Sequence, residues 1–394
     1  MNKFFSKFLD QDGHLTSLGW DAIQAGFTFI GAAVAVIGFF YSIPRVRREL
    51  EKLQKAQQEA TSAVNRLERI EKVIGDEDVQ LWLRDTKKPD GYDTRIYKSK
   101  PIITIANLKG GVGKTTITAN LAAALASQVK PGSSENYRVL VIDLDWQGSL
   151  SALMIGQGGF TDGPEIDRMS RTAEKLISSE GTGTWAMEVA KSVKRDIPST
   201  RFLASNYTLA TAENNALFRW LLEKFDTDAR YHLASVLLDK EVQDSVDYIL
   251  LDAPPRLTTA TINALCASTH VLVPTILDRQ STNGVFRFLR QLDRMQGELF
   301  PRLKPLGVLA SMTYGWDAFT LKEQEVIGDL KVRLAKTWNG TMPFLDTVRI
   351  RRDANILDNA GQRLAYFADS DNIKRAFDAL AEDVIKRTAR DEDS

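Results

Sequence analysis

The residues best suited to chemistry form one short run, KGGVGKTT, at positions 109–116. The run follows an apolar stretch and opens a segment with helical spacing, so it should join a strand to a helix. Glycines in such a turn let backbone N–H groups converge on an anion. Lys114 adds a positive charge between phosphates, and the Thr115 hydroxyl is suited to ligating Mg²⁺. The residues expected to form this nucleoside triphosphate site are Gly110, Gly111, Val112, Gly113, Lys114, Thr115 and Thr116.

Three carboxylates stand where two apolar runs end. Asp143 and Asp145 follow residues 139–142, and Asp252 follows residues 248–251. Carboxylates at strand ends beside a phosphate loop are suited to holding Mg²⁺ and orienting water. The alternative is that these acids only cap strand ends in solvent.

The elements that position these residues alternate between strand and helix patterns. The expected strands are residues 102–106, 139–142, 201–204, 248–251, 271–273 and 307–310. Near-continuous apolar strands separated by helices indicate an α/β fold, with a mostly parallel sheet covered by helices on both faces. The candidate residues fall at the carboxyl ends of strands, where ligands bind in such sheets. A closing helix should bury Ile373, Phe377, Leu380 and Val384.

Three motifs together resemble the ParA/MinD family of ATPases, which carry a deviant Walker A motif. KGGVGKTT is similar to the family's phosphate loop, DLDWQG at 143–148 to its DxDPQG segment, and DAPP at 252–255 to its DxPP segment. Trp146 replaces the family's proline, and Leu108 stands where the generic P-loop pattern has glycine. The resemblance implies a P-loop NTPase domain over residues 101–390 that binds ATP and Mg²⁺.

The resemblance also implies roles for the charged residues. Two subunits would sandwich two ATP molecules, with Lys109 reaching across the homodimer to the partner's nucleotide. Asp145 would position the attacking water, and Lys114 would contact the phosphates. Asp252 would hold Mg²⁺ through water beside Thr115, and Asp143 would lie in the outer shell of the metal. The sequence has no Asn-Lys-x-Asp guanine signature, which favours ATP over GTP.

The N-terminal part differs in composition. After an N-terminal segment, residues 1–21, residues 22–44 carry no charged side chain. As a helix they would extend about 33 Å, enough to cross the hydrocarbon core of a bilayer. A buried core helix is the alternative. Basic residues are more frequent just after this span than before it, which places the C-terminal side in the cytoplasm. We therefore predict a single-pass protein of the inner (cytoplasmic) membrane with its ATPase domain in the cytoplasm.

A short heptad pattern follows over residues 45–75. The apolar positions, spaced by three and four, are Leu53, Ala56, Ala60, Ala63, Leu67, Ile70 and Ile74. They predict a helical coiled-coil segment, although a single helix packed on the ATPase domain fits the pattern too. Residues 76–100 are expected to form a connector, in which Trp82 should pack against another part of the protein.

The overall composition sets few limits on function. The chain has 394 residues, no net charge and 43% hydrophobic residues, as an ordinary globular protein has. A single cysteine, Cys266, excludes an internal disulfide, so we expect a reducing compartment and no structural zinc. DNA binding has local support only, from arginines at 279–302 and 349–352.

Three functions are consistent with this pattern. The first is a membrane-tethered, ATP-dependent dimerisation switch that positions or gates an unknown protein partner. The second is an ATP-gated membrane sensor or scaffold of a defence complex. The third is a bacterial tyrosine kinase, which is disfavoured because no tyrosine follows Tyr366 and because Lys109 is typical of the first class.

Overall fold

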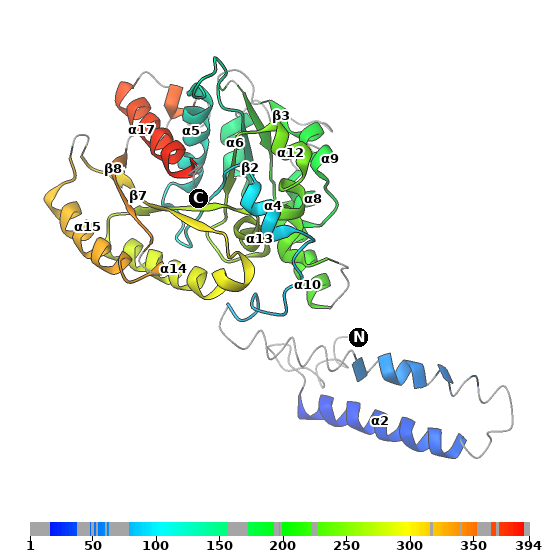
Figure 1. The fold of residues 1–394 in the computed structure, drawn as a ribbon. Helices are drawn as coiled ribbons and strands as arrows, with labels where there is room; N and C mark the ends of the chain where they lie inside the picture. The colour runs from blue at the N-terminus through cyan, green and yellow to red at the C-terminus, as the bar shows by residue number, and fades with distance from the viewer. Residues whose placement is uncertain are drawn as a thin grey trace. The chain divides into compact units, whose positions relative to one another are not determined.

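The computed structural model divides the chain into two compact units, residues 1–76 and residues 77–394 (Figure 1). The described residues are 16–37, 48, 51–52, 54–59, 61–62, 79–155, 172–192, 197, 199–222, 227–315, 318–338, 341–352, 364–367 and 370–389.

The second unit is built on an eight-stranded sheet with the order β3-β4-β2-β5-β1-β6-β7-β8. All neighbouring strands are parallel except β3 and β4, which pair antiparallel. The strands are β1 Ile102–Ile105, β2 Val139–Asp143, β3 Lys191–Ser192, β4 Thr200–Leu203, β5 Tyr248–Asp252, β6 His270–Ile276, β7 Lys304–Thr313 and β8 Phe344–Arg351. The parallel α/β sheet and all six predicted strands are confirmed.

Helices cover both faces of this sheet. In chain order they are α4 Tyr92–Lys98, α5 Lys114–Ser127, α6 Ser149–Ile155, α8 Thr172–Ile177, α9 Gly183–Val189, α10 Thr208–Leu221, α11 His232–Leu237, α12 Lys240–Ser245, α13 Thr259–Ala267, α14 Arg279–Leu299, α15 Leu321–Leu334 and α17 Asp371–Thr388. Short 3₁₀ turns lie at Ala229–Tyr231 and Ala365–Phe367. Consecutive strand residues face opposite sides of a sheet, so Ile102 and Ile103 of β1 enter two different cores.

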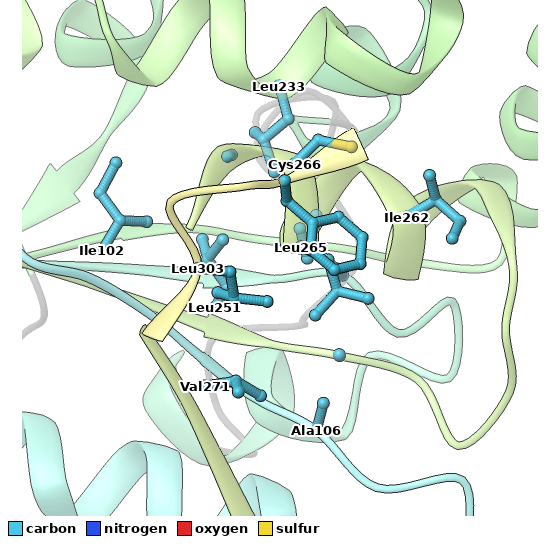
Figure 2. Packing of buried hydrophobic residues seen from close by; sticks show 14 of the residues in the cluster. Ile102, Ala106, Leu233, Leu251, Ile262, Leu265, Cys266, Val271 and Leu303 are labelled. Carbon is cyan, nitrogen blue, oxygen red and sulfur yellow. The ribbon is translucent and has the colours of Figure 1, made fainter. Parts of the chain in front are cut away.

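One core lies between the sheet and the pair α5 and α17, and it contains Ile103. The predicted face of α17 is confirmed, because Ile373, Phe377, Leu380 and Val384 are all buried there. The opposite core lies under α11, α13 and α14. Figure 2 shows Leu251 and Val271 of the sheet beneath Leu265 and Cys266 of α13, with Ile102 of β1 to one side.

Residues 79–98, here called the docked segment, pack against the rest of the second unit. The Trp82 side chain is 3% exposed and stacks on Trp220 of α10 with ring centroids 6.1 Å apart. The Tyr92 hydroxyl donates a hydrogen bond to the backbone carbonyl of Cys266 at 2.5 Å. The docked segment therefore contacts the helices that cover one face of the sheet.

A fully buried arginine fixes the docked segment. The Arg230 guanidinium donates to the backbone carbonyls of Trp82, Arg84 and Asp85. It also forms an ion pair with Asp228, itself buried. Burying this charge is tolerable because its donors are paired, and removing the acceptors would leave it uncompensated.

The connector predicted for residues 76–100 is thus corrected. From residue 77 onward the chain belongs to the second unit and includes α4, although the prediction that Trp82 packs against another part of the protein is confirmed. The buried apolar side chains Val79, Trp82, Tyr92 and Ile96 are too few and too widely spaced to form a recognisable helix or strand pattern.

The first unit contains α2, Ser17–Ile37. The span predicted at residues 22–44 overlaps α2 as far as Ile37, and its remainder lies outside the described residues. Where the chain is described, no helix has both the length and the apolar composition needed to cross a bilayer. The described positions between 48 and 62 are helical, as predicted, while most of the heptad positions lie outside the described residues, so the coiled coil stays a prediction.

We expect Trp82→Ala to lower the free energy of unfolding of the second unit by about 3–5 kcal/mol, because it removes a buried aromatic and leaves a cavity beside Arg230. Urea unfolding of the full chain measures this change. Tyr97→Ala is the matched control, since Tyr97 lies in the same segment but is 59% exposed. Equal effects of the two substitutions would contradict the packing described here.

Candidate functional site

The phosphate loop lies between β1 and α5 and is held by hydrogen bonds to β6 and β7. Gly111 and Gly113 have φ angles of 72° and 82°, a region that side chains rarely adopt. The Ser311 hydroxyl on β7 donates to the Val112 carbonyl at 2.8 Å. The Asn107 side-chain amide donates to the Pro274 carbonyl of β6 at 2.8 Å. The sheet therefore fixes the loop before any ligand binds.

Lys114, Thr115 and Asp252 meet at the start of α5. The buried Lys114 ammonium donates to the Lys109 carbonyl at 3.3 Å. Burial lowers the pKa of Lys114, against the charges of Asp252 and Asp145. The Thr115 hydroxyl donates to a carboxylate oxygen of Asp252 at 2.8 Å. The two residues predicted to face the metal thus lie in direct contact.

The two strand-end carboxylates lie side by side. Asp143 pairs in register with Asp252 on the neighbouring strand, and both side chains are buried. Burial raises the pKa of Asp252, and the charge of Asp143 raises it further, while Thr115 and Lys114 oppose both effects. Burial also raises the pKa of Asp143. The site therefore concentrates negative charge in a position with little water.

The two acids of the DLDWQG segment differ in their surroundings. Asp143 accepts hydrogen bonds from the Ser151 amide at 2.8 Å, the Ser151 hydroxyl at 2.7 Å and the Asp145 amide at 3.0 Å. Its oxygens are therefore engaged by α6 and by the loop before it, and the carboxylate in contact with Thr115 is that of Asp252. Asp145 is partly exposed, and its carboxylate accepts from the Gln147 amide at 3.1 Å. That exposure leaves Asp145 accessible to water.

This arrangement fits a nucleoside triphosphate with Mg²⁺. A divalent cation beside Thr115 and Asp252 would offset the buried negative charge that raises the pKa of Asp252. Within the described ranges, no group of three or more His, Cys, Asp or Glu side chains is placed to hold a metal. Mg²⁺ usually keeps several waters and binds through one or two protein groups plus phosphates, which matches this donor set.

Lys109 is held by its own chain. Its ammonium donates to the Ser281 hydroxyl at 2.7 Å and lies 3.8 Å from the Asp278 carboxylate. Partial burial raises the pKa of Asp278, but hydrogen bonds from Ser281 and the charge of Lys109 outweigh it, so the pKa is below its usual value. Asp278 caps α14. Sequence reasoning missed both partners, although Asp278 follows an expected strand as the other site carboxylates do.

The arginines predicted at 279–302 and 349–352 include exposed side chains. Arg287 and Arg290 are exposed on α14, three residues apart and hence on one helix face. Arg352 at the end of β8 is exposed as well. The structure does not bring these residues into the hydrogen-bond network of the phosphate loop.

A parallel sheet with a glycine loop opening a helix, an adjacent strand-end carboxylate and a buried lysine defines a P-loop nucleotide-binding protein. Comparison with known proteins agrees. Residues 100–305 match the family model described as an AAA domain.

Two relatives extend this agreement. The chain is 30% identical over 246 residues to the chromosome partitioning protein ParA of Caulobacter vibrioides, covering 61% of this chain and 80% of that protein. It is 30% identical over 287 residues to the chromosome-partitioning ATPase Soj of Thermus thermophilus, covering 72% and 95%. The solved structure of apo McdA from Cyanothece has a TM-score of 0.56 at 19% identity, covering 72% and 99%. The chain belongs to the ParA/MinD-like family of P-loop ATPases.

We expect Asp252→Asn to stabilise the nucleotide-free protein by about 1 kcal/mol near pH 8 while abolishing stabilisation by Mg²⁺ and ATP. Because the folded-state pKa of Asp252 is raised, the stability that its protonated form contributes is lost as pH rises through that pKa. The asparagine side chain does not titrate, so its advantage should grow from about pH 4 to pH 8 and stay constant above that.

Thermal unfolding over this pH range, with and without Mg²⁺ and ATP, measures both effects. Wild type measured at each pH is the reference, because the two proteins differ only in the side chain at position 252. A nucleotide-free Asp252→Asn protein less stable than wild type throughout would contradict the electrostatic account.

Proposed function

We propose that this protein is a membrane-tethered ATPase that binds ATP with Mg²⁺, dimerises around it and hydrolyses it to ADP and phosphate, so that the dimer state positions or gates a partner complex. The observation that carries the ATPase assignment is the contact between Thr115 at the start of α5 and the buried carboxylate of Asp252. The family membership of the chain supports the same assignment.

Each residue has a role in this proposal that follows from its position. The loop amides and Lys114 bind the phosphates, and burial strengthens these charge contacts because little water competes. Thr115 and Asp252 hold Mg²⁺, which neutralises charge on the phosphates when bound. Asp145, partly exposed on the neighbouring strand end, orients the attacking water. Asp143 supports this geometry by accepting the Asp145 amide hydrogen bond.

Dimerisation in this proposal depends on Lys109. An ammonium group that donates to Ser281 of its own chain must leave that contact before it reaches a partner's nucleotide. The contact is partly exposed and involves one hydrogen bond and a 3.8 Å ion pair, so leaving it costs little. ATP would then favour the dimer by offering Lys109 a stronger anionic partner.

Membrane attachment is proposed from the sequence. Residues 22–44 lack charged side chains, and basic residues follow them at 45–55. The proposed location is therefore the inner membrane, with the second unit in the cytoplasm where ATP is available. DNA binding through exposed arginines such as Arg287 and Arg290 is a second candidate activity, favoured by their shared helix face.

Substitution of Lys109 and Asp145 should separate assembly from hydrolysis. In a chain beginning at residue 77, Lys109→Ala should bind ATP but remain monomeric, because only the contact across the dimer is lost. Asp145→Ala should bind ATP and dimerise but release phosphate about a hundredfold more slowly, since the water is misplaced while phosphate contacts survive. Light scattering and phosphate release measure the two steps.

Lys240→Ala is the control, because Lys240 is an exposed lysine that pairs with Asp244 on α12. If Lys109→Ala dimerised with ATP as wild type does and Asp145→Ala hydrolysed at the normal rate, the proposed mechanism would be wrong.

Membrane fractionation tests the proposed location. Full-length protein should stay in the membrane fraction after carbonate washing, because an apolar span is not released by high pH. The chain beginning at residue 77 should be found in the supernatant and still bind ATP, since it retains both cores and the docked segment. Full-length protein released by carbonate would reject the membrane span.

A further inference from the structure

A buried carboxylate outside the phosphate loop joins two helices near the site. Glu213 lies in the middle of α10 and is 6% exposed. Its carboxylate accepts a hydrogen bond from the Ala260 amide of α13 at 2.8 Å, and the Thr258 hydroxyl also bonds to it. The Thr259 hydroxyl donates to the Glu213 backbone carbonyl at 3.3 Å. The first turn of α13 is therefore attached to α10.

A short loop joins this first turn of α13 to Asp252, the carboxylate beside Thr115. Residues 253–258 connect Asp252 to α13, and two of them, Pro254 and Pro255, have no backbone N–H to donate. The near end of this loop is held by the Ala253 amide, which donates to the Ile105 carbonyl of β1 at 3.2 Å. At its far end, the hydrogen bonds to Glu213 hold Thr258 and the start of α13. The position of the loop thus depends on both attachments.

The other end of α10 is connected to the Asp143–Asp145 segment. Just before α10, the Ser205 amide donates to the Ser151 hydroxyl at 2.9 Å, and that hydroxyl donates to Asp143 at 2.7 Å. Gly148 packs against the Ser205 carbonyl so closely that a Cβ there would lie 3.0 Å from it. Helix α10 therefore contacts the segment that follows Asp252, and the residues just before α10 contact the segment that follows Asp143.

The charges around Glu213 agree with this placement. Burial raises the pKa of Glu213, and the charge of Asp145 raises it as well, while hydrogen bonds from Thr258 and Ala260 and the charge of Arg256 lower it. Glu213 therefore lies close enough to Asp145 and Arg256 for their charges to act on it. A change in the position of Glu213 would alter its electrostatic interactions with both residues.

We propose that Glu213 is a positioning residue for ATP hydrolysis: by attaching the first turn of α13 to α10, it fixes the loop after Asp252 relative to Asp145. This proposal rests on the proposed ATPase function. Asp145, which orients the attacking water in this proposal, and Asp252 lie at the ends of neighbouring strands, so loosening one against the other misplaces the nucleophile without removing a phosphate contact. Misplacement of this kind affects the rate more than nucleotide affinity.

Two substitutions of Glu213 in the full chain separate the effect of side-chain length from the effect of negative charge. Glu213→Asp keeps the negative charge but withdraws the carboxylate by one methylene, so the hydrogen bond to Ala260 is lost. Glu213→Gln keeps the reach and an acceptor oxygen but removes the charge. Asn214→Ala is the matched control, because Asn214 is the exposed neighbour on α10. Single-turnover phosphate release gives the rate, a fluorescent ATP analogue gives the dissociation constant, and thermal unfolding reports stability.

We expect Glu213→Asp to slow phosphate release about tenfold while the dissociation constant changes by less than about threefold. Glu213→Gln should restore the rate to within about twofold of wild type, because a hydrogen bond to the Ala260 amide is enough to position the turn. The control should be unchanged.

Three results would overturn the proposal: a wild-type rate for Glu213→Asp, a Glu213→Gln protein as slow as Glu213→Asp, or parallel losses of rate, affinity and thermal stability. The last of these indicates a purely structural carboxylate. Asp145→Ala measured alongside tests the ATPase function separately. A wild-type rate for that variant rejects the proposed role of Asp145, whatever Glu213 does.

Discussion

The side-by-side burial of Asp143 and Asp252 is the constraint on which the site depends. Parallel pairing of β2 with β5 places the two carboxylates in register, and burial of both strands removes most of the water that would screen them. Lys114 and Thr115 offset only part of the resulting cost, as the raised pKa of Asp252 indicates. The arrangement of these carboxylates is therefore less stable without ligand than with a divalent cation and phosphates bound.

Much of this arrangement follows from local sequence. Apolar, β-branched runs predict the buried parallel strands, and acids at the ends of such strands must gather at one edge of the sheet. The positions of Lys114, Thr115 and Asp252 therefore needed no tertiary information beyond strand order. The sequence does not predict strand β8 because polar and charged residues interrupt its apolar run, which is unlike the near-continuous apolar runs of the other parallel strands, and it does not predict β3 because that strand has only two residues.

The parts that sequence did not predict depend on pairs far apart in the chain. Arg230 lies 148 residues from Trp82, and nothing in either local pattern indicates that one donates to the carbonyl of the other. Glu213 is a single acid on a helix, and its burial and its hydrogen bonds with Ala260 and Thr258 depend on residues more than 40 positions away. Helical periodicity predicts which face is buried and gives no partner for a buried charge.

The contact between Lys109 and Ser281 shows how such a partner affects mechanism. A lysine free in solvent would lose side-chain entropy when it reaches an anion, whereas Lys109 is already ordered by one hydrogen bond and one long ion pair. Breaking these partly exposed contacts costs on the order of 1 kcal/mol. A phosphate contact in a water-poor interface is stronger than that because it is charge-assisted and less screened. The contact with Ser281 therefore orders the Lys109 side chain and still allows its ammonium to contact a nucleotide phosphate instead.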